Sequence, residues 1–559
     1  MRSIYVLLLG AAATVSAALN SSSSVPWANL TISAPVNGRY LYRTSNDEPF
    51  FWQADTAWEL FHRLNRSDAD FYLQDRASKG FNVVQAVAIA ELNGTTWPNF
   101  LRRILDGDLP LIDKDPMKPN EAYFEYIDWV VNRAAEYGIL IALVPTWGAY
   151  MNCGWYNQSW VIFNHTSAEW YGNYIGTRYP GLPKIIGADS NGFWSCNISE
   201  ASSEWEADPS LDQASLVGPI RDWRSVFARL ADGLREAEAK KGFTSFIAWH
   251  PTNVQEIGTD KPYGHNYMNG SFGRLSMDAV QSGHTLADHT SLAQEFYALQ
   301  EWDSTKNYNN ITEMRAAFPG PVIDLENHYE GAHIAFNASL PLWNTSIVRH
   351  GLWNAFLSGS AGFTYGAQAV WQMYAPESEL AYSWLYMPPR LTLAANESWR
   401  DALKYPGSTQ AGYLQQLFSG LDKEMFNSLQ PNRTFIKTPG SSDGDILSYQ
   451  ANRYVAALVG LRQYWLYTGF GDAFDLDLDA LGQQFGEVKG EAKSEWFDPR
   501  TGKAQNTTSS FQLSGRKTFE PPTGGSVDND WAFVLTLVPK IFLDLLELRS
   551  MRKNTHLNY

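Results

Sequence analysis

Several features that would assign a function directly are missing from the sequence. No Lys/Arg-rich run occurs in the 559 residues, and 59 acidic residues outnumber 43 basic ones, which gives a formal net charge of −16. A phosphate backbone would meet no basic patch, so nucleic acid is excluded as an expected partner. The sequence also has no P-loop and no dinucleotide-binding glycine fingerprint. We therefore expect no nucleotide cofactor, and nothing in the sequence indicates another one.

Long apolar runs are scarce as well. The apolar stretch from Ile4 to Ala13 precedes the small residues Val15-Ser16-Ala17. Even with those small residues the segment has only roughly 15 residues, fewer than the ~20 that cross a bilayer, and its layout is typical of a secretory signal peptide. We predict a signal peptide over residues 1–17, a secreted, extracellular protein and no membrane partner.

Cysteine is also scarce, since only Cys153 and Cys196 occur. In an oxidising compartment an even number of cysteines favours a disulfide over a reactive thiol, and this bridge would contribute about 4 kcal/mol of stability. Asn-x-Ser/Thr sequons recur from Asn20 to Asn506 and predict a glycoprotein.

Apolar and aromatic residues, by contrast, are abundant at 44% and 14% of the chain, enough for packed cores. From about residue 50 to 370, short apolar runs alternate with helical patterns, which is typical of βα units on a parallel sheet. The expected strands are Phe50–Asp55, Asn82–Glu91, Leu140–Trp147, Ile185–Asp189, Ser245–His250, Ala279–His284, Val322–Glu326 and Gly362–Gly366. The expected helices are Ser67–Ser78, Glu121–Tyr137, Val226–Lys241, Ser291–Trp302 and Ser346–Leu357.

Eight such strands are the number that closes a barrel. A doubly wound sheet would fit the same alternation, but no glycine-rich phosphate loop follows the first strand. We therefore predict an α/β protein with a (β/α)8 TIM barrel over residues 25–430. Short alternating segments at Tyr454–Val459, Tyr464–Tyr467 and Trp531–Leu535 predict a small antiparallel β-sandwich over 432–540. The tail at 541–559 is too short to span a membrane. For the oligomeric state, we expect a monomer.

Catalytic groups of such barrels project from the carboxyl ends of the strands. Polar or aromatic residues that end or follow the apolar runs are therefore candidates to bind or cleave a substrate. They are Asp55, Trp58, Glu91, Trp147, Asp189, Asn191, His250, Gln281, His284, Glu326, Tyr329, Glu330 and Tyr365.

Two of these carboxylates, Asp189 and Glu326, end the fourth and seventh strands and would face each other across the barrel mouth. One could donate a proton while the other attacks or stabilises an oxocarbenium-like centre, as glycoside hydrolysis requires. Tryptophans near the same loops could stack on sugar rings, although many tryptophans serve only as core anchors. The histidines show no metal-binding spacing, and His328 and His333 lie five residues apart, so we predict no metal site.

Six segments occur in the order of a known family. They are Phe51–Trp58, Gly80–Gln85, Ile185–Asn191, Gln281–His284, Asp324–Gly331 and Gly362–Ala367. Together they resemble the apiosidase-like glycoside hydrolases of family 140. The segments Trp496–Gly502 and Phe519–Trp531 resemble the C-terminal domain that accompanies this barrel, a domain often labelled collagen-binding.

The resemblance implies a retaining, exo-acting hydrolase that removes apiose-containing units from the pectin rhamnogalacturonan II. Its acid/base falls on Asp189 and its nucleophile on Glu326, with Glu330 as the rival nucleophile. The chain departs from the family at Ala188, where glycine is usual, and in a long insertion between His250 and Gln281.

We expect an oligo- or polysaccharide substrate from the plant cell wall. Two alternatives remain: the same mechanism acting on another furanoside or pyranoside, and a non-catalytic secreted carbohydrate-binding protein built on the barrel.

Overall fold

A computed structural model of the protein describes residues 25–538 except 36, 100–106, 153–160, 195–220, 253–260, 262, 271–272, 285–304, 377–393, 438–453, 487–489, 506 and 527. The predicted signal peptide, Cys153, Cys196, the tail at 541–559 and the helix expected over Ser291–Trp302 lie outside these residues. Among the helices that are described, none is long and apolar enough to cross a membrane.

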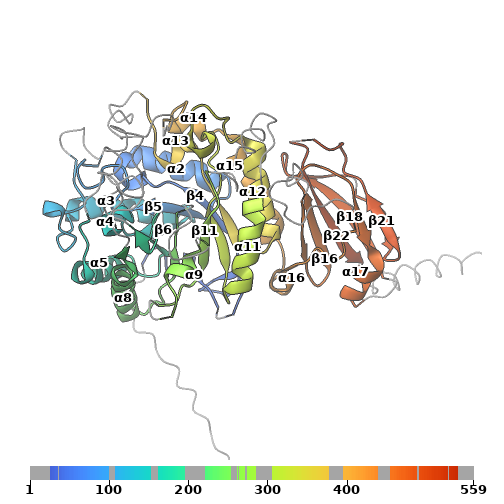
Figure 1. Ribbon diagram of the computed structural model, residues 1–559, viewed down its shortest axis with the longest axis horizontal. Coiled ribbons are helices and arrows are strands. Elements are labelled where there is room, and N and C mark those ends of the chain that lie inside the picture. The colour runs from blue at the N-terminus through green and yellow to red at the C-terminus, as the bar shows by residue number, and fades with distance from the viewer. Residues whose placement is uncertain are drawn as a thin grey trace, which may run out of the picture.

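Parallel strands form the centre of the larger domain (Figure 1). Six of them pair in the order β10-β7-β6-β5-β4-β13, and β11 pairs with β12. Their bounds are β4 (Trp52–Thr56), β5 (Val83–Val87), β6 (Leu140–Val144), β7 (Lys184–Ile186), β10 (Ile247–Trp249), β11 (Asp278–Gln281), β12 (Val322–Glu326) and β13 (Gly362–Tyr365). Every residue of these strands is buried, which explains their unbroken apolar runs. Each of the eight predicted strands overlaps one of them, although several predictions, such as Ile185–Asp189 for β7, run past the end of the strand.

Helices follow most of these strands. Those of four residues or more around the parallel sheets are α1 (Leu60–Arg63), α2 (Arg66–Ser78), α3 (Glu121–Glu136), α4 (Ala149–Asn152), α5 (His165–Arg178), α8 (Arg224–Lys240), α9 (Gly264–Tyr267), α11 (Thr305–Ala317), α12 (Thr345–Leu357), α13 (Gln368–Trp371), α14 (Trp399–Ala402), α15 (Pro406–Ser419) and α16 (Lys423–Ser428). The predicted helices at α2, α3, α8 and α12 are confirmed.

Asparagine side chains cap the starts of several long helices. Asn65, Asn164 and Asn344 accept backbone N–H bonds at the starts of α2, α5 and α12. The sequence analysis did not predict α5, α11 or α15. Helix α5 contains two glycines because α8 packs against it there: a Cβ at Gly172 would lie 2.2 Å from the Leu230 carbonyl oxygen. The apolar periodicity of α5 is correspondingly weak.

Short antiparallel strands surround the parallel sheets. They are β1 (Ile32–Ser33), β2 (Leu41–Arg43) and β3 (Pro49–Phe50), which form one sheet, and β8 (Phe193–Trp194) with β9 (Arg221–Asp222).

The C-terminal domain consists of antiparallel sheets, as predicted. The larger has the order β14-β15-β16-β22-β18-β19, with β20 also paired to β18, and the smaller pairs β17 with β21. The bounds are β14 (Gln430–Pro431), β15 (Val455–Val459), β16 (Gln463–Thr468), β17 (Phe474–Asp477), β18 (Glu491–Asp498), β19 (Lys503–Gln505), β20 (Phe511–Gln512), β21 (Arg516–Phe519) and β22 (Trp531–Val538), with helix α17 (Leu478–Gln484).

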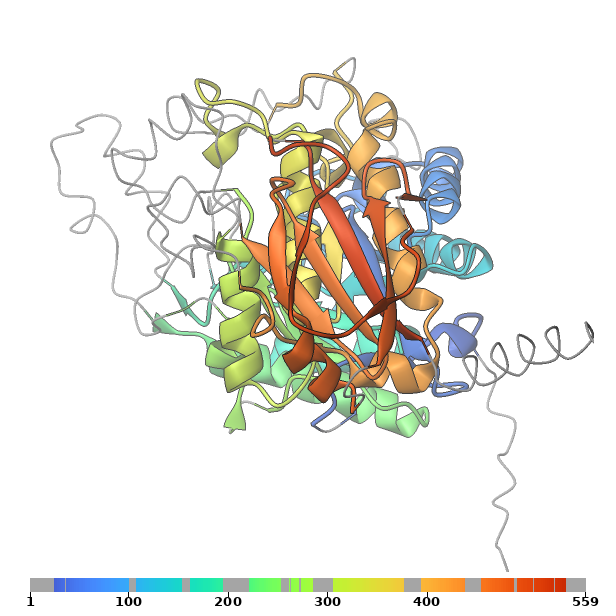
Figure 2. The same ribbon diagram turned by 90° about the vertical axis from the view of Figure 1, so that its right-hand side faces the viewer.

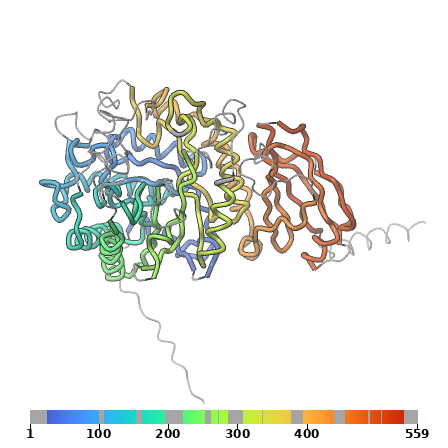
Figure 3. Tube along the Cα trace, viewed as in Figure 1, coloured from blue at the N-terminus to red at the C-terminus, as the bar shows by residue number. Residues whose placement is uncertain are grey.

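The central strands of the larger sheet are buried on both faces. Along β16, Trp465 and Tyr467 join the core of the parallel-sheet domain, whereas Tyr464 and Leu466 join a second core with β17 and β21. Figure 2 shows this sheet in front of the helices of the larger domain, and the trace in Figure 3 passes directly from α16 into it. The C-terminal domain is therefore packed as part of the same body.

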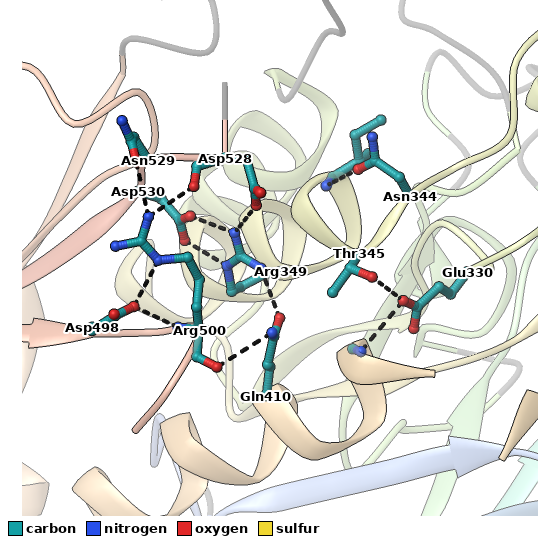
Figure 4. A network of polar contacts seen from close by, with 12 residues as sticks. Glu330, Asn344, Thr345, Arg349, Gln410, Asp498, Arg500, Asp528, Asn529 and Asp530 are labelled. Atoms are coloured by element: carbon teal, nitrogen blue, oxygen red, sulfur yellow. Dashed lines mark hydrogen bonds and ion pairs between the residues drawn. The ribbon is translucent and has the colours of Figure 1, made fainter. Parts of the chain in front are cut away.

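A buried ion pair lies where the two domains meet (Figure 4). Arg349 of α12 donates through Nε to Asp530 Oδ2 (2.7 Å) and through Nη2 to both Asp530 and Asp528. Tyr467 also donates to Asp530 (2.9 Å), and the ring of Trp353 stacks on Tyr467 at 5.3 Å. Both oxygens of this buried carboxylate thus have hydrogen-bond partners.

Candidate active site

Glu326 ends β12, and three polar side chains surround its carboxylate. Gln281 Nε2, at the end of the neighbouring β11, donates to Glu326 Oε1. His284 Nε2 binds the same oxygen, and His250 Nε2, just beyond β10, lies 3.4 Å from Oε2. The backbone of His284 is left-handed, with φ at 74°. A non-glycine residue keeps such a strained conformation only where its surroundings hold it.

Asp189 follows β7 and faces the same cluster. The Gln281 side chain that donates to Glu326 also hydrogen-bonds to Asp189. One carboxamide therefore reaches both carboxyl groups. Unlike Glu326, which is buried, Asp189 is partly exposed, so solvent or a ligand can reach it.

The pKa values of the two carboxyl groups are displaced in opposite directions. Burial, followed by the nearby charge of Glu326, raises the pKa of Asp189 to about 7. Burial would also raise the pKa of Glu326, but His284 and His250 outweigh it and lower that pKa. Contact with Glu326 in turn raises the pKa of His250 against the effect of burial. Near neutral pH the pair therefore holds one ionised carboxylate and one carboxyl able to donate a proton.

Glu91 is a third carboxyl group in this cluster. It lies in the loop after β5 and is partly exposed. Burial, then the charges of Asp189, Glu59 and Glu326, raise its pKa well above the usual value for glutamate. A neutral Glu91 could both donate to and accept from a sugar hydroxyl.

Aromatic rings continue the wall of the cluster. Trp58 Nε1 donates to the Tyr329 hydroxyl (3.1 Å), and the Trp58 ring packs edge-on against Trp147 and His250 at 5.8 and 5.4 Å. Tyr329 packs against His284 at 5.0 Å. Burial, and then Glu326, raise the pKa of Tyr329, which keeps the phenol protonated.

The side chain of Asn191 is buried beside this region, and neither of its amide atoms has a hydrogen-bond partner among the described residues. The predicted residues Trp58, Glu91, Trp147, Asp189, His250, Gln281, His284, Glu326 and Tyr329 thus belong to one connected set.

Three predicted site residues are engaged elsewhere. Asp55 is fully buried and accepts from Tyr72 Oη and Arg76 Nε, both at 2.6 Å. Glu330 accepts from the Tyr365 hydroxyl at 2.6 Å, and its other oxygen accepts from Thr345 Oγ1 and the Gly407 N–H. Asp55, Glu330 and Tyr365 therefore tie α2, α12 and α15 to the strands through Asp55 Oδ2, both oxygens of Glu330 and the Tyr365 hydroxyl.

The sequence analysis missed two carboxylates that support the site. Asp324 lies two residues before Glu326 on β12, hence on the same face, and accepts from Ser282 Oγ beside Gln281. Glu59 accepts from the Leu92 N–H (3.0 Å) and from His62 Nδ1 (2.6 Å). A signal for both existed, because Glu59 directly follows Trp58 and Asp324 shares a strand face with Glu326.

Metal ligands are not grouped in the described part of the chain, where no three His, Cys, Asp or Glu side chains are arranged to hold an ion. The site's chemistry is thus that of paired carboxyl groups, two imidazoles and an aromatic wall. A family model described as "Apiosidase-like, catalytic domain" matches residues 35–424.

The chain belongs to this apiosidase-like family.

A second model, described as "Putative collagen-binding domain of a collagenase", matches residues 446–536 of the apiosidase-like chain. A search of curated protein sequences gives no match to this chain. The fold resembles that of a glycoside hydrolase family 5 protein from Bacteroides vulgatus ATCC 8482, with a TM-score of 0.68, 21% identity, and coverage of 92% of this chain and 94% of the other. A structure titled "Glycoside hydrolase" gives a TM-score of 0.66 and 22% identity over 92% and 98% of the two chains. Family and fold together identify a glycosidase.

Proposed function

We propose that the protein is a retaining glycosidase with Glu326 as nucleophile and Asp189 as acid/base. The observation that carries this proposal is that the pKa of Asp189 is raised while that of Glu326 is lowered. The two carboxyl groups also lie close enough for the Gln281 side chain to contact both. Pairs of carboxyl groups with separated pKa values are the arrangement that divides acid and nucleophile roles in glycosidases. Contacts to Thr345, Tyr365 and Gly407 make Glu330 the less suitable nucleophile.

The first step follows from these protonation states. Glu326 attacks the anomeric carbon while Asp189 donates its proton to the departing oxygen, giving a glycosyl-enzyme and a free alcohol. Asp189, now ionised, then takes a proton from water as the water attacks the anomeric carbon and releases Glu326. Gln281 hydrogen-bonds to both carboxyl groups and so holds their relative positions through both steps.

The substrate we propose is an apiose-containing unit at the end of a rhamnogalacturonan II side chain, and the cellular setting is secretion. The family assignment and the predicted signal peptide at residues 1–17 support this.

We also propose that the parallel strands close into an eight-stranded barrel. A parallel bridge between Ala248 and Met277, and the bond from the Ala361 N–H to the Val322 carbonyl oxygen (2.8 Å), support the two junctions between the sheets.

Product analysis on rhamnogalacturonan II tests this function. We expect the enzyme to release a reducing sugar whose first-formed anomer has the configuration of the cleaved bond, observed by proton NMR before mutarotation. An inverted first product would contradict the double displacement through Glu326. An unsaturated product absorbing in the ultraviolet would indicate a lyase, and no release would favour a carbohydrate-binding role.

The pH dependence gives a second test. Because Asp189 must be protonated in the first step and its pKa is about 7, kcat/KM is expected to be constant at mildly acidic pH. Above pH ~7 it should fall roughly tenfold per pH unit. Glu326, with its lowered pKa, stays ionised throughout this range.

Asp189→Asn is the control for that profile. On a 2,4-dinitrophenyl glycoside, whose aglycone leaves without protonation, wild type should lose the alkaline decline, and the residual activity of Asp189→Asn should show none either. A decline that persists in Asp189→Asn would assign the titrating group to another residue, such as Glu91.

A further inference from the structure

The loop that carries Asp189 has a strained backbone. Gly187 and Asp189 both have left-handed conformations, with φ at 78° and 47°, and the Ser190 N–H closes the turn onto the Gly187 carbonyl oxygen at 2.7 Å. Glycine is required at 187 for a second reason, since a Cβ there would lie 2.4 Å from the Trp249 ring. Asp189 has no such freedom, and a left-handed aspartate costs roughly 1–2 kcal/mol. The turn therefore depends on neighbours that hold it.

Residues 148–152, which include α4, hold this turn from both sides. On the side before Asp189, the Gly148 N–H donates to the Ala188 carbonyl oxygen (3.1 Å). The approach is so close that a Cβ at Gly148 would lie 2.3 Å from the Ser190 Cβ. On the side after Asp189, Asn152 makes the remaining contacts.

Asn152 uses both ends of its carboxamide on the turn. Its Oδ1 accepts from Ser190 Oγ (2.7 Å), and its Nδ2 donates to the Asn191 carbonyl oxygen (2.6 Å). Asn152, Ser190 and Asn191 are all fully buried, so water does not compete for these bonds. The pattern needs an acceptor and a donor at one position, which asparagine supplies and aspartate or leucine does not.

We propose that Asn152 is a positioning residue for Asp189, holding the turn in the conformation that presents the carboxyl group to the leaving-group oxygen. This inference rests on the proposed function, in which Asp189 is the acid. Asn152 itself touches neither substrate nor Glu326 in this scheme. Its loss should therefore impair proton donation selectively and leave attack by Glu326 largely intact.

The test compares Asn152→Leu with wild type on two aryl β-D-apiofuranosides. The 4-methylphenyl glycoside needs protonation of its leaving group, whereas the 2,4-dinitrophenyl glycoside does not. A misplaced group costs on the order of 10²-fold in rate. We expect kcat/KM to fall by about that factor on the first substrate and by less than about threefold on the second. Ser190→Ala, which removes one of the two bonds, should give a smaller loss with the same preference.

Asn354→Leu is the matched control, because Asn354 is an equally buried asparagine on α12 whose amide, among the described residues, bonds to His350 alone (3.3 Å). It should lower the melting temperature without any dependence on the leaving group. Equal losses of Asn152→Leu on both glycosides, or no loss, would overturn the inference.

A readout that needs no substrate separates this inference from the proposed function. The crystal structures of Asn152→Leu and Ser190→Ala should show Asp189 displaced from its left-handed conformation. An unchanged turn in both variants would overturn the positioning role even if wild type cleaved neither glycoside. Inactivity of wild type on both glycosides, with the turn displaced in the variants, would instead count against the proposed substrate alone.

Discussion

Glu326→Gln is expected to lower kcat by at least roughly 10³-fold, with KM changed far less. Glutamine has nearly the same shape and can still accept the hydrogen bond from Gln281, but its amide cannot form the glycosyl-enzyme. The effect is measured as the rate of reducing-sugar release from rhamnogalacturonan II at pH 5 to 6. Equal release by the variant and wild type would remove the enzymatic mechanism proposed for this carboxylate.

Glu330→Gln is the matched control for this prediction. Glu330 lies four residues further along the chain and is equally buried, but its oxygens accept bonds from Thr345, Tyr365 and the Gly407 N–H. Its replacement should lower the melting temperature and leave most of the activity. A folded Glu330→Gln variant as inactive as Glu326→Gln would transfer the nucleophile role to Glu330.

The eight parallel strands could be predicted because their burial on both faces leaves a plain apolar run in the sequence. The rule that polar residues at strand ends approach one another brought Asp189, His250 and Glu326 together correctly. The same rule also predicted Asp55 as a site residue, although Asp55 is engaged in the interior of the domain. Arg76 of α2 pairs with Asp55 in the interior at 2.6 Å. Arg76 falls at helical spacing on the same buried face as Tyr72 and Leu73, but the spacing does not show which carboxylate it would pair with.

Asn152 escaped prediction for a different reason. Helix α4 has only four residues, which is too few for a periodic pattern, and its contacts to Ser190 and Asn191 join segments 38 and 39 residues apart. The strands of the C-terminal domain were predicted from short alternating segments, but the sequence carried too little information about how the two domains dock. The buried pairing of Arg349 with Asp530 spans 181 residues and depends on that docking.

Arg349→Met is expected to destabilise the whole protein by about 3–5 kcal/mol, because it leaves the buried carboxylate of Asp530 without its cation. Arg349 and Asp530 are both buried, and the charge of Asp530 raises the pKa of Arg349 even though burial acts to lower it. Methionine fills much of the same volume, so the lost stability reports on charge more than on a cavity. Chemical denaturation followed by tryptophan fluorescence measures the free energy of unfolding.

Arg462→Met is the control for that measurement, since Arg462 also bonds across the domain boundary, to Asp422 (2.6 Å), but with half-exposed side chains. It should change the stability little, because solvent screens such pairs. Since Trp465 and Tyr467 belong to the core of the larger domain, Arg349→Met should unfold both domains in one transition at lower denaturant. Two separate transitions, with the C-terminal domain unfolding alone, would show that the apolar contacts at this boundary are too weak to couple the domains, and that the buried ion pair is what joins them.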